Sequence, residues 1–201
     1  MDYTGNLIRP PSEANSIILQ VTLGCSYNKC TFCGAYKDAR FTIKPAGTIN
    51  EDIAFAGKYC TNQSRLFLAD GDVLILKQSY LVDLLKNIRR NIPGVKKISL
   101  YGSSRAINRK NQNELSELKS LGLDRIYMGL ESGCDEVLKT VNKGATAESM
   151  IMAAEKIQKA GIFLSVSVLL GLGGSLLSER HAILTARALN KMAPQQIAAL
   201  T

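Results

Sequence analysis

The sequence has no uncharged apolar run of about 18 residues, the length that a membrane-spanning helix needs. Its first residues, Met-Asp-Tyr-Thr-Gly, lack the basic segment followed by an apolar segment that marks a secretory signal. No low-complexity segment or linker interrupts the chain. We therefore expect a cytoplasmic protein with no membrane partner.

Cysteines are too few and too clustered for a disulfide scaffold, with five in 201 residues. Cys25, Cys30 and Cys33 fall within nine residues, whereas Cys60 and Cys134 stand alone. In a reducing compartment, such a cluster of thiols indicates a metal site.

The chain is basic, with 25 Lys and Arg against 17 Asp and Glu and a formal net charge of +8. These cations are spread along the sequence, and pairs such as Arg89-Arg90 are too short to form a nucleic-acid stripe. A solvated basic surface is the simpler interpretation, and an anionic substrate such as RNA is the alternative.

Apolar segments alternate with helical patterns along a chain that is 46% hydrophobic, which suits one domain with a core. Six segments predict strands, most of them buried on both faces: 17–23, 66–69, 98–101, 126–130, 162–170 and 197–200. Four stretches predict helices: 80–88, 115–121, 150–157 and 183–189. This alternation predicts a parallel sheet, open or closed into a barrel, with ligands at the carboxyl ends of its strands.

The three clustered cysteines directly follow the first predicted strand, on a loop flanked by Gly24 and Gly34. Three thiolates on such a loop can bind three corners of an iron-sulfur cubane and leave its fourth iron open. Structural zinc is the alternative, because a Cys-x-x-Cys pair is a common half of a zinc site. The fourth ligand for zinc would have to come from residues that stand alone in the sequence.

With Phe32 just before the last cysteine, this loop resembles the signature of the radical S-adenosylmethionine (radical SAM) superfamily. The spacing differs, since four residues separate Cys25 from Cys30 where the usual pattern has three. The resemblance implies a [4Fe-4S] cluster on the three cysteines and S-adenosylmethionine as second cofactor. It also implies a partial parallel (β/α)6 barrel over residues 16–201, preceded by an N-terminal extension, residues 1–15. Because the sequence ends within the sixth predicted strand, we expect a fragment truncated in or after that strand.

Other predicted strand ends resemble the superfamily in the same order. The resemblance assigns S-adenosylmethionine binding to further residues after the second, fourth and fifth strands: Ala69, Asp70, Gly71, Asp72, Glu131, Ser132, Leu170 and Gly171. In superfamily members, backbone carbonyls after the second strand receive the methionine amino group, polar groups after the fourth strand reach the ribose or methionine, and the segment after the fifth strand lies against adenine. Asp-Gly-Asp alone is a common turn, and Glu131 could simply favour a helix N-terminus.

The function implied by the resemblance is reductive cleavage of S-adenosylmethionine to a 5′-deoxyadenosyl radical, which abstracts hydrogen from an unidentified substrate. It also implies an electron donor such as a flavodoxin or a ferredoxin. Two alternatives remain: a zinc-stabilised binding module, and a truncated iron-sulfur protein without activity. We interpret His181, the only histidine, as structural or exposed, and Cys134 as a small buried residue.

Overall fold

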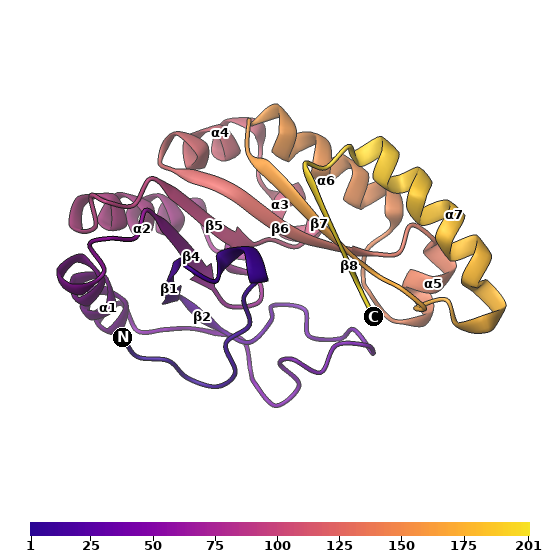
Figure 1. Ribbon diagram of the computed structural model, residues 1–201, viewed down its shortest axis with the longest axis horizontal. Coiled ribbons are helices and arrows are strands. Elements are labelled where there is room, and N and C mark those ends of the chain that lie inside the picture. The colour runs from indigo at the N-terminus through magenta and orange to yellow at the C-terminus, as the bar shows by residue number, and fades with distance from the viewer.

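The computed structural model describes residues 1–201, whose strands form a six-stranded parallel sheet in the order β1-β4-β5-β6-β7-β8 (Figure 1). The strands are β1 (Ile17–Gln20), β4 (Arg65–Ala69), β5 (Lys97–Tyr101), β6 (Leu123–Glu131), β7 (Phe163–Leu169) and β8 (Gln196–Leu200). All five neighbouring pairs are parallel. The α/β class and the parallel sheet predicted from the sequence are therefore confirmed.

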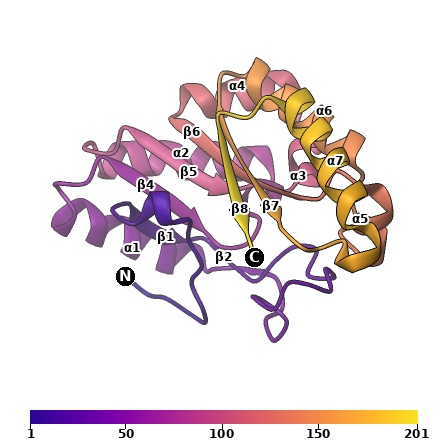
Figure 2. The ribbon, with the colours of Figure 1, turned by 45° about the vertical axis from the view of Figure 1, so that its right-hand side comes forward.

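Helices cover the outer face of the curved sheet (Figure 2). They are α1 (Ala46–Tyr59), α2 (Gln78–Asn91), α3 (Ser104–Arg109), α4 (Gln112–Ser120), α5 (Asp135–Thr140), α6 (Ala147–Lys159) and α7 (Gly174–Met192). The chain also forms two short 3-10 helices, η1 (Pro11–Glu13) and η2 (Val73–Ile75). None of them combines the length and apolar character that a membrane crossing requires.

Side chains alternate along each strand between a face that packs against the helices and an inner face. In β4, Leu66 and Leu68 join the main core, whereas Phe67 and Ala69 belong to a separate small cluster with Tyr127. Side chains of a strand point alternately to its two faces, so this second cluster lies on the inner face of the sheet. The central strands are buried on both faces, as predicted.

The sheet remains open, because β1 and β8 each pair with one neighbour only. Strand β8 is an exception to the predicted burial: Ile197 and Leu200 are about half exposed, at 51% and 50%. It is an edge strand, so one side of it lacks a neighbour.

The first predicted strand is shorter than expected. After Gln20, only Val21 still bonds to β4, through its N–H to the carbonyl of Ala69 (2.6 Å). The next two residues form β2 (Thr22–Leu23), which pairs antiparallel with β3 (Thr42–Ile43) in a separate two-stranded sheet. This pairing turns the chain out of the main sheet and places loop 24–41 beyond its carboxyl edge.

The N-terminal residues are built into the inner side of the sheet. Glu13, in η1, is fully buried. Its carboxylate accepts hydrogen bonds from four side chains: Ser16, Arg65, Ser99 and Tyr127. Further along, the Thr4 N–H donates to the Gln20 side chain (2.9 Å), which donates back to the Thr4 carbonyl (2.9 Å). This segment thus covers part of the inner face and the free side of β1.

Candidate functional site

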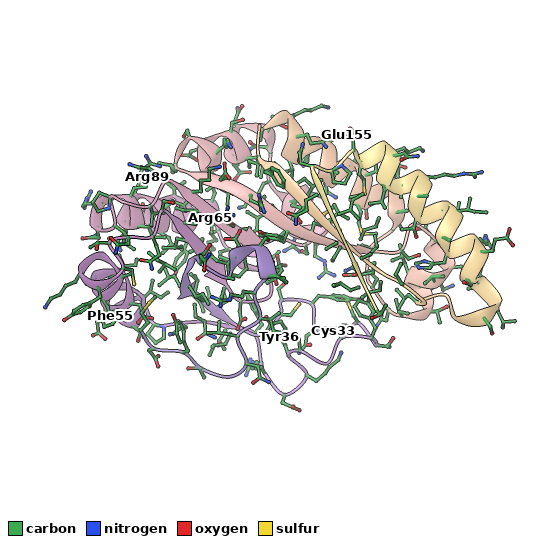
Figure 3. The ribbon with its side chains drawn as sticks, in the orientation of Figure 1. Cys33, Tyr36, Phe55, Arg65, Arg89 and Glu155 are labelled. Carbon is green, nitrogen blue, oxygen red and sulfur yellow. The ribbon has the colours of Figure 1, made fainter.

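Loop 24–41 carries Cys25, Cys30 and Cys33, all partly exposed and none in a disulfide. Figure 3 places Cys33 and Tyr36 on this loop, beyond the carboxyl ends of the central strands. The structure thus puts the predicted thiols at the predicted edge of the sheet.

The three thiols lie close enough to influence one another. Burial raises the pKa of the Cys30 thiol, Lys143 opposes this rise, and negative charge on Cys25 and Cys33 adds to it. Glu131 also raises the Cys30 pKa, so the loop lies beside the end of β6. Two of the predicted strand ends therefore meet at the cysteines.

The tip of β4 packs directly against the backbone of the same loop. A Cβ atom on Gly71 would lie 3.0 Å from the Gly24 carbonyl oxygen and 3.1 Å from the Cys25 Cα. Only glycine permits this approach without moving main chain. Gly71 thus contributes to the site through its lack of a side chain.

Asp70 and Asp72, which flank Gly71, are buried, with 2% and 1% of their surface exposed. The Tyr36 hydroxyl donates to Asp70 Oδ1 (2.7 Å), and the Ser26 hydroxyl donates to Asp72 Oδ2 (2.6 Å). Burial raises the pKa of both carboxyls, although these hydrogen bonds oppose the rise. Both aspartates therefore point into the protein and bind the cysteine loop.

The end of β6 presents an ion pair beside the thiols. Lys143 Nζ lies 3.0 Å from Glu131 Oε1, and both side chains are largely buried. Lys143 also lies 5.7 Å from the ring centroid of Phe32. Next to it, Gly144 has a φ of +69°, and a Cβ there would overlap the ring of Tyr27. The cysteine loop therefore packs against the segment that follows α5.

Ser132 follows Glu131 but faces the interior, fully buried. Its hydroxyl lies 2.8 Å from His181 Nδ1 and accepts a hydrogen bond from the Cys134 N–H (3.0 Å). His181 Nε2 lies 3.0 Å from the carbonyl oxygen of Leu169, which ends β7. His181 is therefore buried rather than exposed, and it links the tips of β6 and β7.

The end of β7 is the most open part of the site. Leu170 is 56% exposed, and its N–H donates to the carbonyl of Leu200 at the end of β8 (2.7 Å). Gly171 follows with a φ of +76°, a conformation that glycine adopts without strain. An exposed apolar residue beside a glycine turn offers a surface on which a flat ring could lie.

Sequence reasoning missed four residues that hold the site together: Gln20, Ser26, Tyr36 and Lys143. For Gln20, Ser26 and Tyr36 the available signal was their position, since each lies at a strand end or within a few residues of a cysteine, whereas Lys143 follows α5 and gave no such signal. Polar side chains in such places are the natural anchors for an irregular loop, whose backbone lacks regular partners.

The donor set of the loop fits an iron-sulfur cluster. Three unpaired thiols are partly accessible, and Lys143 provides positive charge beside them. No three His, Cys, Asp or Glu side chains converge closely enough to bind a single metal ion. A zinc ion needs its ligands to meet at one point, whereas a cubane is held by cysteines at separate irons. The loop therefore offers the three thiolates that such a cluster requires.

A family comparison agrees with this arrangement. The model of the radical SAM superfamily matches residues 19–186, which include the cysteine loop and the ends of β4, β6 and β7.

Among curated proteins, 4′-phospho-dehydrooxetanocin synthase of Priestia megaterium is 25% identical over 175 residues, which cover 77% of this chain and 23% of that protein. The chain thus spans about a quarter of the length of this relative.

Solved structures show the same fold. The cobalamin-dependent S-adenosylmethionine radical enzyme OxsB, with aqua-cobalamin bound, matches with a TM-score of 0.67 and 21% identity, covering 86% of this chain and 26% of that one. The radical S-adenosylmethionine methyltransferase TsrM of Kitasatospora setae, with cobalamin and a [4Fe-4S] cluster bound, matches with a TM-score of 0.70 and 16% identity, covering 92% and 36%.

Proposed function

Because the chain belongs to the radical SAM superfamily, whose enzymes use a [4Fe-4S] cluster and S-adenosylmethionine, we propose that Cys25, Cys30 and Cys33 hold such a cluster here. The chain is accordingly part or all of an enzyme whose substrate is unidentified. When bound, the reduced cluster supplies the electron that cleaves S-adenosylmethionine to methionine and a 5′-deoxyadenosyl radical, which abstracts hydrogen from the substrate.

The observation that carries this proposal is the meeting of three elements at one place. The cysteine loop lies against Gly71 after β4 and beside the Glu131–Lys143 pair after β6. Ligands of parallel α/β sheets bind at the carboxyl ends of the strands, so a cofactor held by the thiols would reach both tips.

Within this site, the chain's own groups bind and orient S-adenosylmethionine. In this proposal the backbone carbonyls of the turn at residues 69–72 accept hydrogen bonds from its amino group, and that of Ala69 already accepts one from the Val21 N–H (2.6 Å). Glu131 supplies a polar contact for the ribose or methionine. Ser132 positions the β6 turn, and Leu170 with Gly171 provides the surface for adenine.

An electron donor such as a flavodoxin or a ferredoxin completes the proposed reaction. The cysteines are partly exposed, so a reductant can approach the cluster from solvent. The net charge of +8 suits an acidic donor, although long-range attraction of this kind weakens at high salt.

Anaerobic reconstitution tests the proposal. After iron and sulfide are added, the protein should be brown and contain about four irons per chain. Addition of dithionite and S-adenosylmethionine should then yield 5′-deoxyadenosine and methionine. The Cys25→Ala/Cys30→Ala/Cys33→Ala variant should yield neither cluster nor product.

Cys60→Ala is the matched control, because Cys60 follows α1 outside the cysteine loop and should leave both readouts unchanged. A colourless protein with one bound zinc would overturn the proposal in favour of a zinc-binding module. A complete cluster without cleavage of S-adenosylmethionine would leave only an iron-sulfur protein.

A further inference from the structure

Asp72 connects three segments that are distant in sequence. Its Oδ2 accepts hydrogen bonds from the hydroxyls of Ser26 (2.6 Å) and Ser103 (2.8 Å), and its Oδ1 accepts one from the Ser103 N–H (3.1 Å). Ser26 directly follows the first cysteine, and Ser103 is the N-cap of α3, after β5. One buried carboxylate thus ties the start of the cysteine loop to two strand ends.

Asp70 ties the other end of the same loop. Its Oδ1 accepts a hydrogen bond from the Tyr36 hydroxyl (2.7 Å), and its Oδ2 accepts one from the Gln20 amide (3.2 Å). The backbone of Gly24 is a further hydrogen-bond partner of this carboxyl. Because Gly24 precedes the first cysteine and Tyr36 follows the last, the two aspartates hold the loop on both sides of its thiols.

All four oxygens of the two carboxylates already have hydrogen-bond partners within the protein. Both side chains are almost completely buried, at 2% and 1% exposure. A cofactor bound above the loop would have to break these bonds to reach either carboxylate, and a buried donor left without an acceptor costs about 1–3 kcal/mol. Direct contact between cofactor and carboxylate is therefore unfavourable.

We propose that Asp70 and Asp72 are positioning residues that hold the cysteine loop in its ligand-binding shape before any cluster is present. This inference rests on the proposed function only in naming the cluster as the loop's ligand. Ordering a loop costs about 1 kcal/mol or more for each residue fixed, and a loop ordered in advance spares the binding step this cost. The Asp-Gly-Asp turn thus holds the cysteine loop in place at the edge of the sheet.

Hydrogen-deuterium exchange of the apoprotein tests this inference without any cofactor. In the unsubstituted apoprotein, protection is expected at the loop amides that donate hydrogen bonds: Gly24 to Asp70, Thr31 to the Val141 carbonyl (2.9 Å) and Ala39 to the Tyr36 carbonyl (3.1 Å). Removing one hydroxyl donor from each aspartate, in the double variant Ser26→Ala/Tyr36→Phe, should raise their exchange about thirtyfold, since two lost hydrogen bonds of about 1 kcal/mol each together cost about 2 kcal/mol. Asp72→Ala should have a larger effect, provided that its far-ultraviolet circular dichroism shows a folded protein.

Cluster stability gives a second readout. In reconstituted protein, the double variant should lose iron to a chelator about tenfold faster, while the affinity of the remaining holoprotein for S-adenosylmethionine changes less than about twofold. Ser26→Thr in place of Ser26→Ala should restore slow iron release, because threonine keeps the hydroxyl donor.

Asp38→Asn is the matched control, since Asp38 is an exposed carboxylate on the same loop and should change neither readout. Two results would overturn the inference: fast exchange of the loop in unsubstituted apoprotein, or loss of S-adenosylmethionine affinity in the double variant with iron release unchanged. If the loop is ordered by the aspartates but no cluster assembles, the proposed function fails and the inference stands.

Discussion

Buried carboxylates lie at both ends of the sheet, and their surroundings differ. Glu13, towards the amino ends of the strands, faces Arg65 at 2.9 Å and several hydroxyl donors. Asp70 and Asp72, at the carboxyl ends, receive hydrogen bonds but form no ion pair. Burial raises all three pKa values, but the donors around Glu13 outweigh it, so its pKa is lowered while those of the aspartates are raised.

The difference indicates that these carboxylates have different roles, one in stabilising the fold and the others in shaping the site. A carboxylate compensated in an ion pair favours the folded state, whereas buried carboxylates that form no ion pair are held at a cost to stability. In barrels of parallel strands, the carboxyl ends carry the active site and the amino ends support the fold. We therefore assign Glu13 to the fold and the two aspartates to the cysteine loop.

The largest effect on stability is expected from Glu13→Ala. This substitution leaves Arg65 without its partner and removes the acceptor of the Ser99 and Tyr127 hydroxyls. The free energy of unfolding should fall by about 3 kcal/mol, as for other broken buried pairs. Urea unfolding followed by circular dichroism measures it.

Glu155→Ala on α6 is its control, because Glu155 is exposed and lies far from η1 (Figure 3). It should change the free energy of unfolding by less than about 0.5 kcal/mol. Equal losses in the two variants would refute the role assigned to Glu13.

A smaller effect on stability, but a large one on the site, is expected from Gly71→Ala. The new methyl group would clash with the backbone of Gly24 and Cys25, which cannot move aside by rotating as a side chain can. Unfolding free energy should fall by about 1–3 kcal/mol, and iron content after reconstitution should fall severalfold. Gly34→Ala, on the same loop with no atom within 4 Å of the added Cβ, should retain its iron. Equal iron contents would contradict the account.

The smallest effect is expected from pH. Because the pKa of Glu13 is lowered on folding, its contribution to stability is complete above its ordinary pKa of 4.5 and is lost as pH falls through the folded value. The pKa values of the two aspartates are raised on folding, so their effect has the opposite sign. Their contribution to the free energy of unfolding is complete below pH 3.8 and is lost as pH rises through the folded pKa values. Urea midpoints between about pH 3 and about pH 7 should therefore show a flatter acid limb for Glu13→Gln and a steeper one for Asp70→Asn. Parallel curves for the two variants would reject the contrast.

Much of the fold could be predicted from the sequence, because buried parallel strands are continuous apolar runs. The predicted segments 66–69 and 98–101 each fall within one residue of β4 and β5. The predicted first strand is too long. Its apolar sequence does not distinguish residues that pair with β4 from the residues of β2, which turn away and pair with β3. Pairing between distant segments leaves no local pattern.

The site could be predicted only in part. The spacing of the cysteines and the order of the strands predicted that the thiols and the ends of β4, β6 and β7 lie at one edge of the sheet. These patterns are local or repeat along the chain, so the sequence reveals them. The roles of Glu13 and Tyr36 could not be predicted, since both depend on contacts with residues more than 30 positions away. The direction of a side chain could not be predicted either. Ser132 lies in the predicted turn, but its hydroxyl contacts His181 in the interior.

The central claim is that the three cysteines hold a cluster with one open iron, and electron paramagnetic resonance tests it most directly. The reconstituted protein, reduced with dithionite, should show the signal of a reduced [4Fe-4S] cluster, and its g-values should shift when S-adenosylmethionine is added. The Cys25→Ala/Cys30→Ala/Cys33→Ala variant should show no signal. A cluster signal that S-adenosylmethionine leaves unchanged, or one that survives in the triple variant, would contradict the account.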